Sequence, residues 1–297
     1  MWILFAAGSA VFAALTGILA KIGVRSTDSN TATAVRTGVV LLFSWMLVFL
    51  TGEYRELSLL RDSPSDLVWI LLSGLATGAS WLCYFHAIKL GSVNRVAPID
   101  KSSALLTVLA SFVLFHEAVT PWKIAGAALM TAGLLCGVIP NKSKRAETDD
   151  KQTSRGWLFF AVASAVCAAL SSVLAKLGMV SVGSNTATAL RTVVVLVMSW
   201  LVVLLTRKKS EDGSLSPLRI DKKDLLFIVL SGLATGGSWL CYFRALRDGD
   251  MSTVVAVDKL SLPLTVLLSF VILREKPRFT AAAATVLITL GAFAMIM

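Results

Sequence analysis

The sequence predicts an all-α membrane protein with ten transmembrane helices, built as two inverted five-helix repeats. Three observations carry this prediction. Hydrophobic residues make up 56% of the 297 positions and charged residues only 15%, and the mean hydropathy of +0.77 lies far above that of a soluble domain. The chain also contains ten apolar segments, and its second half repeats its first half.

The repeat is visible in two pairs of segments. SNTATAVRT at 29–37 returns as SNTATALRT at 184–192, and LSGLATGASWLCYF at 72–85 returns as LSGLATGGSWLCYF at 230–243. A repeat this long is a whole domain and not the unit of a solenoid. We therefore expect three parts, which are a first repeat over 1–140, a polar linker over 141–156 and a second repeat over 157–297.

The first half contains five apolar segments, with most of the positive residues between them. Each segment is close to the ~20 residues that a helix needs to cross about 30 Å of hydrocarbon. The segments lack the strict alternation of apolar and polar residues that is typical of strands in a membrane barrel. Their backbone polar groups must therefore form hydrogen bonds within α-helices. The five expected helices are Trp2–Ile22, Thr31–Leu50, Leu67–Leu90, Val96–Phe115 and Trp122–Ile139.

The second half repeats this order after the linker, which is charged and has no apolar periodicity. Its long internal loop, 207–224, contains the extra residues that change the repeat offset. No stretch fits a separate soluble domain. The five expected helices are Trp157–Leu177, Thr186–Thr206, Leu225–Leu246, Val254–Leu273 and Thr280–Met297.

The orientation of the two halves follows from the odd number of helices in each. Because each half crosses the membrane five times, the second half must enter it upside down relative to the first. Loops on the linker's face carry seventeen basic residues, and loops on the opposite face carry five. This bias predicts a cytoplasmic linker with both chain termini outside. The loop 53–66 holds two arginines among four acids, whereas its copy at 207–224 holds six basic residues.

Several kinds of site are not expected from this sequence. The four cysteines all lie in apolar segments without CxxC or Cys/His spacing, and neither histidine has a histidine at the matching position of the other half. We therefore expect no metal and no cofactor. No catalytic triad pattern or phosphate-binding glycine loop is present, so an enzyme is not expected. No basic stripe with interleaved aromatic residues suggests nucleic acid as a partner.

Both halves share a set of family features. An element beginning with phenylalanine closes the third helix (Phe85–Ile88 and Phe243–Leu246), and a glutamate follows the fourth (Glu117 and Glu275). A glycine-rich fifth helix comes next. Over nearly its whole length the chain resembles two EamA modules of the drug/metabolite transporter superfamily. The resemblance implies ten helices around a central solute cavity and movement of small metabolites, often outward. Members are often described with cytoplasmic termini, opposite to the charge bias.

Charged side chains inside the expected spans are the sharpest chemical signal. Many family members have proline in the fourth helix where this chain has Asp100 and Lys101, and Arg36 lies in the second helix. At ~1.5 Å per residue, each lies roughly 6 to 8 Å inside its helix. Such charges cost at least ~2.5 kcal/mol each, and they usually pair, line water or mark a pathway. Their copies in the second half are Arg191, Asp258 and Lys259.

These charged residues suggest a gate that is present twice, near opposite faces of the membrane. Asp100 would pair with Arg36 or Lys101 when the inside is shut. Asp258 would pair with Arg191 or Lys259 when the outside is shut, and alternating access would exchange the two. The alternative is that both groups are fixed ion pairs that lock the starts of helices.

Aromatic residues deep in the third helix of each half are further candidates. They either line the solute path or pack in the core, because a buried Trp or Tyr needs a hydrogen-bond partner or water. Glu117 and Glu275 are expected to be caps or loop anchors rather than proton carriers. GxxxG at Gly74 and its copy at Gly232 predict close helix packing. The aromatic candidates are Trp81, Tyr84, Trp239 and Tyr242.

The sequence therefore predicts a secondary transporter that moves a small polar or anionic metabolite by alternating access. Asp100 or Asp258 could bind a proton and couple export to it. The alternatives are a flippase for a lipid-linked phosphate, a membrane assembly partner that transports nothing, and a passive channel. The expected location is the cell (inner) membrane as a multi-pass protein, in contact with the lipid bilayer and a small-molecule solute, as a monomer or homodimer.

Overall fold

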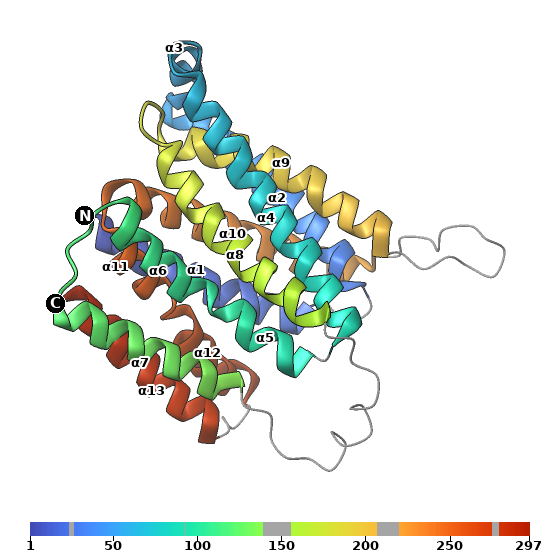
Figure 1. The fold of residues 1–297 in the computed structure, drawn as a ribbon. Helices are drawn as coiled ribbons and strands as arrows, with labels where there is room; N and C mark the ends of the chain where they lie inside the picture. The colour runs from blue at the N-terminus through green and yellow to red at the C-terminus, as the bar shows by residue number, and fades with distance from the viewer. Residues whose placement is uncertain (24–26, 92, 139–155, 207–219, 275–278) are drawn as a thin grey trace.

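The computed structural model describes residues 1–23, 27–91, 93–138, 156–206, 220–274 and 279–297, and these residues form helices with short connections (Figure 1). The predictions that concern the linker, Glu275 and most of the loop 207–224 fall outside the described residues. Both chain ends lie at the same end of the helix bundle, as Figure 1 shows. We call this end the termini face and the opposite end the linker face.

The first repeat contains seven α-helices and one 3-10 helix among the described residues. Its long helices begin and end within a few residues of the expected spans, because apolar length sets both. The elements are α1 (Trp2–Gly23), α2 (Ser29–Thr51), η1 (Glu53–Ser58), α3 (Leu59–Asp62), α4 (Pro64–Leu90), α5 (Val93–Lys101), α6 (Ser103–Leu114) and α7 (Pro121–Val138).

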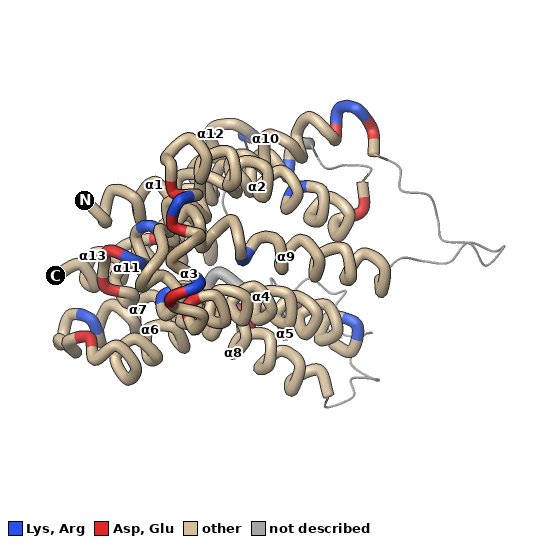
Figure 2. Tube along the Cα trace, turned by 90° about the horizontal axis from the view of Figure 1, so that it is seen from above, with Lys and Arg blue, Asp and Glu red and all other residues tan. Residues whose placement is uncertain are grey.

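The second repeat follows the same order without a described counterpart of η1 and α3. Its helices are α8 (Gly156–Leu177), α9 (Ser184–Thr206), α10 (Lys222–Asp248), α11 (Met251–Asp258), α12 (Ser261–Leu273) and α13 (Phe279–Ile296). In Figure 2 the charged positions of the tube gather near helix ends, with long uncharged stretches between them. That distribution suits a bundle surrounded by hydrocarbon.

The two repeats run in opposite directions and are interleaved. The Asn30 side-chain amide at the start of α2 donates to the Thr206 hydroxyl at the end of α9, 2.9 Å away. Just past the other end of α2, the Glu53 carboxylate accepts from the backbone N–H of Thr186 at the start of α9. Copies of one helix therefore lie antiparallel, as inverted repeats require. Across the repeats, α1 packs on α10, α8 on α4, α2 on α9 and α7 on α13.

Glycines bring helices of opposite repeats into close contact. A Cβ at Gly74 of α4 would lie 2.8 Å from the carbonyl oxygen of Arg191 in α9, and a Cβ at Gly232 of α10 would lie 3.2 Å from that of Arg36 in α2. Gly78 contacts Met198 of α9 in the same way. The prediction of close packing at GxxxG is confirmed, and the partner helix belongs to the other repeat each time.

The fourth and ninth predicted spans are each interrupted, which the sequence analysis missed. Ser102 separates α5 from α6, where its hydroxyl donates to the carbonyl of Ile99, 2.6 Å away. Lys259 and Leu260 separate α11 from α12, where Pro263 has no N–H to offer to the carbonyl of Lys259. Among the described residues, eight spans are long and apolar enough to cross a bilayer, and α7 is a shorter apolar helix. Ten crossings therefore stay a prediction.

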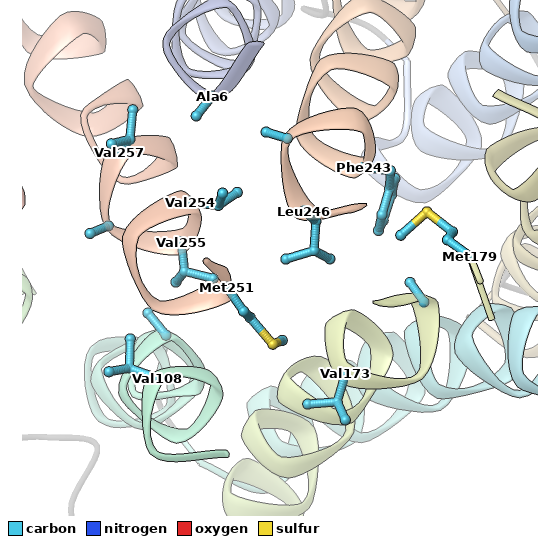
Figure 3. Packing of buried hydrophobic residues seen from close by; sticks show 14 of the residues in the cluster. Ala6, Val108, Val173, Met179, Phe243, Leu246, Met251, Val254, Val255 and Val257 are labelled. Carbon is cyan, nitrogen blue, oxygen red and sulfur yellow. The ribbon is translucent and has the colours of Figure 1, made fainter. Parts of the chain in front are cut away.

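The largest buried core lies toward the termini face. It joins residues of both repeats, and Figure 3 shows Ala6 of α1 and Val108 of α6 around Leu246 of α10 and Met251 of α11. Every residue from Met251 to Val257 is buried. A second described cluster, with Ala87, Val96 and Ala161 at its centre, joins α4, α5 and α8 nearer the linker face.

Candidate functional site

A cavity of about 350 Å³ lies between the two repeats. Residues from α1, α4 and α6 of the first repeat and from α8 to α11 of the second line it, together with Lys259 beyond the end of α11. Five of the ten residues singled out from the sequence are among these lining residues. They are Arg191, Trp239, Tyr242, Asp258 and Lys259.

Arg191 is held in the cavity wall by hydroxyl groups. Its side chain is buried, with the residue 3% exposed. Nε donates to the Ser73 hydroxyl at 3.2 Å, and Nη2 donates to the hydroxyls of Thr77 at 2.8 Å and Ser171 at 2.9 Å. Among the described residues, no carboxylate forms an ion pair with it. We call the hydroxyls of Ser73, Thr77 and Ser171 the arginine socket.

Aromatic rings complete the surroundings of this guanidinium. Its carbon lies 4.2 Å from the ring centre of Phe243 and 5.6 Å from that of Trp239. Both rings offer the negative face of their π-systems to the cation. Tyr242 donates to the hydroxyl of Ser172, 3.1 Å away, so its phenol group is also satisfied.

The two aspartates have matching surroundings in the two repeats. Asp258 accepts from the Ser9 hydroxyl at 2.8 Å, and Asp100 accepts from the Ser164 hydroxyl at 2.9 Å. Ser9 and Ser164 occupy equivalent positions on α1 and α8. Each aspartate also pairs with the lysine that follows it, at 3.3 Å for Asp258 with Lys259 and at 3.8 Å for Asp100 with Lys101.

The two groups are expected near opposite faces, and the helix starts in the structure move both of them deeper into the bundle than expected. Both Asp–Lys pairs lie at helix breaks, and each aspartate is seven residues from its helix start, or about 10 Å at ~1.5 Å per residue. The helices begin three residues earlier than expected, at Val93 and Met251, so the charges lie deeper. Ser103, two residues after Lys101, lines the same cavity as Asp258.

The other five candidate residues lie outside the cavity lining. Arg36 is only part-buried and donates to the Thr33 hydroxyl at 3.4 Å. Tyr84 packs in the cluster of α4, α5 and α8, and Trp81 is half-buried. Lys101 lines a separate, mostly apolar pocket among α7, α12 and α13, and Asp100 lies beside it.

A cluster of charged groups joins the two repeats at the termini face. The Glu117 carboxylate accepts from the backbone N–H groups of Met251 and Ser252, at 2.5 and 3.1 Å, and from the Ser252 hydroxyl at 2.5 Å. It therefore caps the start of α11, as expected of a cap or loop anchor. Lys176 at the end of α8 lies 3.8 Å from Glu117 and donates to the carbonyl of Gly249 at 2.7 Å. Lys123 pairs with Asp250 at 3.4 Å.

The Glu117 carboxyl group lies outside the membrane-spanning helices, and its ionised form is favoured. Burial alone would raise its pKa. The hydrogen bonds from the Ser252 hydroxyl and from the N–H groups of Ser252 and Met251, with the charge of Lys176, outweigh burial and hold the pKa below its ordinary value. The start of α11 therefore faces a carboxylate, which the helix dipole also favours.

Sequence reasoning missed the hydroxyl partners of the charged groups. Ser9 and Ser164 hold the aspartates, and Ser73 and Thr77 hold Arg191. A signal for them was present, because all four have a serine or threonine at the matching position of the other repeat. Small hydroxyl residues are common in membrane helices for packing alone, so this signal did not stand out.

Known proteins with similarity to this chain include two curated relatives and one solved structure. An uncharacterized transporter in the cobO 3' region of Sinorhizobium sp is 40% identical over 139 residues, which are 45% of this chain and 94% of that protein. The uncharacterized transporter YvbV of Bacillus subtilis (strain 168) is 25% identical over 144 residues, 48% of this chain and 47% of that protein. A crystal structure of a protein of unstated function has a TM-score of 0.75 at 21% identity, with coverage of 97% of this chain and 94% of that chain. This last likeness concerns the fold alone.

The family comparison covers both repeats. The sequence pattern of the EamA-like transporter family matches residues 1–138 and, again, residues 155–297. The two matches fall on the two inverted repeats, with the cavity between them. The chain therefore belongs to the EamA-like transporter family, as a multi-pass membrane transporter that contains two EamA modules.

Proposed function

We propose that this protein is a secondary transporter that moves a small organic anion through the cavity by alternating access. The observation that carries the proposal is the buried guanidinium of Arg191 in the cavity wall, which meets hydroxyls and aromatic rings and no carboxylate among the described residues. A buried cation without an acid is costly, and an anionic solute would supply the missing charge.

The other charges of the lining support an anion as well. Asp258 and Lys259 neutralise each other at 3.3 Å, so Arg191 leaves one net positive charge on the wall. The volume of about 350 Å³ falls at the lower end of the ~300 to 1,000 Å³ common for small-molecule sites. Helix breaks at matching positions of two inverted repeats are a typical location of a solute site in transporters.

The unequal surroundings of the two repeats support alternating access. Arg191 is buried and Arg36 is part-buried, although nearly identical segments contain them. The core and the charged cluster of Glu117 and Lys176 hold the termini face together. We therefore take this structure as the state with the termini face shut. In the opposite state the first repeat would take the surroundings that the second has here.

Further parts of the proposal concern placement and coupling. The excess of basic residues on the linker's loops favours a cytoplasmic linker face in the cell (inner) membrane. A proton on Asp258 or Asp100 would break its pair with the neighbouring lysine, and this would couple transport to a pH gradient. Breaking and forming the two Asp–Lys pairs is then part of the gate.

Reconstituted protein tests this function. Proteoliposomes with the full chain are screened with labelled small carboxylates, organic phosphates, zwitterions and sugars, with and without a pH gradient. We expect saturable flux of an anionic solute, and Arg191→Gln is expected to lower it at least ~10-fold because the cation is lost. Asp258→Asn is expected to remove the dependence on the pH gradient.

Controls separate transport from its alternatives. Arg244→Gln removes a surface cation of the same helix bundle, which pairs with Asp248 away from the cavity, and it is expected to leave flux unchanged. Flux of no small solute together with translocation of a labelled lipid-linked phosphate would replace the carrier with a flippase. Flux that never saturates would indicate a channel, and equal flux in the wild type and Arg191→Gln would contradict the anion site.

A further inference from the structure

We infer that the protein contains a second arginine socket, formed by Thr16, Ser231 and Thr235, and that Arg36 enters it when Arg191 leaves the first. This inference rests on the proposed alternating access and names the side chains that exchange. It replaces an arginine–aspartate gate with an arginine–hydroxyl gate.

The sequence repeat gives the second socket its members. Arg36 and Arg191 are the same position of the repeated segment SNTATA(V/L)RT. Ser231 and Thr235 of α10 correspond to Ser73 and Thr77 of α4. Thr16 of α1 corresponds to Ser171 of α8. The chain therefore carries a hydroxyl at each of the three matching positions.

The structure brings these three hydroxyl groups together without an arginine. Thr16 and Thr235 are 3.3 Å apart through their hydroxyl oxygens, and Ser231 donates to the carbonyl of Thr16 at 3.2 Å. The occupied socket has the same two bonds, with Thr77 and Ser171 at 2.6 Å and Ser73 donating to the carbonyl of Ser171 at 2.6 Å. The two sockets therefore join the same positions of the repeat, with longer distances in the second socket, which contains no guanidinium.

The backbone of Arg36 is already in place beside the second socket. Its carbonyl oxygen and Val39 approach Gly232, the neighbour of Ser231, at 3.2 and 2.7 Å from a Cβ built there. In the first socket the carbonyl oxygen of Arg191 and Val194 approach Gly74 at 2.8 Å each. The arginine side chain is long enough to span the distance between neighbouring residues on a packed helix. A change of its rotamer, together with a small shift of the helix, would therefore bring the guanidinium to Ser231 and Thr235.

The present partner of Arg36 is a weak one. Its only hydrogen bond described in this structure goes to the Thr33 hydroxyl within its own helix, at 3.4 Å. The second socket offers three neutral oxygen acceptors in one place. They correspond to the three hydroxyl groups that hold Arg191 in the first socket. Each guanidinium would then stabilise one of the two states, because it meets three hydroxyl acceptors in one state and a single distant one in the other.

The same comparison shows one difference between the sockets that lies in the sequence. Tyr242 donates to Ser172 next to the first socket, whereas the matching partner of Tyr84 would be Gly17, which has no hydroxyl. The first socket therefore has an additional polar neighbour, which favours the state with Arg191 bound, the state of this structure.

Cysteine accessibility tests the exchange without knowledge of the solute. In the full chain with its four cysteines replaced by alanine, Ala13→Cys in the cavity lining reports which face admits an impermeant maleimide, in membranes with either face outward. Arg191→Ala is expected to raise labelling from the termini face, and Arg36→Ala and Thr235→Val are each expected to lower it. Because Arg36 and Thr235 would act as a pair, the double variant is expected to lower labelling no further, with a deviation from additivity of about 5-fold or more.

Two further double-mutant cycles, each of two single variants and the double variant, make the result specific. Arg191 with Thr77, which touch at 2.8 Å, is the positive control and is expected to deviate from additivity in the same way. Arg36 with Thr33 tests the purely local role. Additive effects of Arg36→Ala and Thr235→Val, or coupling of Arg36 to Thr33 alone, would overturn the second socket. Ser231→Ala replaces Thr235→Val if that variant does not give monodisperse protein.

The outcome also distinguishes failure of the socket from failure of the proposed function. If Arg191→Ala shifts labelling between the faces while Arg36 and Thr235 act independently, alternating access stands and the exchange is wrong. If labelling keeps the same ratio between the faces in every variant, alternating access fails, and the socket exchange fails with it.

Discussion

Glu117 shows how one side chain outside the membrane can join the two repeats. It belongs to the connection between α6 and α7, and it caps α11 of the other repeat while it pairs with Lys176. The sequence predicted a cap or anchor at this position, but could not say which helix it caps. The hydrogen-bond donors come from residues more than a hundred positions away, and only folding brings them together.

The lowered pKa of Glu117 gives a prediction for stability against pH. A carboxyl group whose folded pKa lies below its ordinary value of 4.5 stabilises the fold above that value, and the stabilisation is lost as pH falls through the folded pKa. Glu117→Gln is expected to lower the apparent melting temperature at pH 7, through a loss of about 1 kcal/mol for the helix cap. Below the folded pKa, the variant and the wild type are expected to melt together.

Thermal unfolding in detergent between pH 7 and pH 3 measures this difference. Asp62→Asn is the matched control, because Asp62 is an exposed acid of the same face, and its melting curve is expected to follow the wild type throughout. A constant gap between Glu117→Gln and the wild type across the whole pH range would show that the side chain acts through packing and not through its charge.

At the scale of helices, the sequence predicted the long spans well and the breaks poorly. Apolar length and flanking polar residues place α1, α2, α8 and α9 within a few residues, since hydrocarbon thickness sets helix length. The breaks at Ser102 and at Lys259 and Leu260 lie inside two predicted spans, at or next to the charged pairs Asp100–Lys101 and Asp258–Lys259. Hydropathy averages over a whole span, whereas the break depends on single backbone hydrogen bonds.

The crossed packing of helices through glycine gives a prediction at this scale. Gly74→Ala is expected to destabilise the fold by about 1 to 3 kcal/mol, because the new Cβ would lie 2.8 Å from the backbone oxygen of Arg191, which cannot move aside. Gly38→Ala, also inside a helix that packs on α9, is the matched control. Its Cβ would be 3.9 Å from Leu196, an ordinary contact, and the higher helix propensity of alanine favours it.

Apparent melting temperatures of the two variants in the same detergent measure the contrast. Gly74→Ala is expected to melt below the wild type, and Gly38→Ala at or above it. Equal melting temperatures would mean that α4 and α9 can separate at no cost, which would contradict close packing of the two repeats at this point.

At the scale of the whole molecule, the two repeats share a sequence and differ in their surroundings. The repeats differ in the burial and contacts of Arg36 and Arg191, in the surroundings of α5 and α11, and in the contacts that the acids of η1 make. The carboxylates of Glu53 and Glu56 accept from backbone N–H groups at the start of α9, so the acidic loop has a structural role besides its orientation signal. The charge of the acidic loop therefore serves contacts across the repeats, in addition to the orientation that the sequence predicts.

The orientation itself is a testable prediction. In the cysteine-free chain, Ser63→Cys before α4 lies at the termini face and Ser143→Cys lies in the linker sequence. We expect an impermeant maleimide to label Ser63→Cys in intact cells, and to label Ser143→Cys only after the membrane is opened, because positive loops stay in the cytoplasm. The reverse pattern would agree with the cytoplasmic termini often described for the family and would contradict the charge bias.

The sequence by itself determined the composition-driven features of this protein. These are its membrane-spanning helices, its duplication, the inversion that an odd number of segments requires, and the list of charged residues that a membrane makes costly. Each follows from local rules of length, hydropathy and repetition. Tertiary structure alone decided which charges share the cavity, because Arg191 and Asp258 line it while Arg36 and Asp100 do not. The segments around Arg36 and Arg191 are nearly identical, so local rules cannot separate these two arginines, and their different surroundings come from the packing of one repeat against the other.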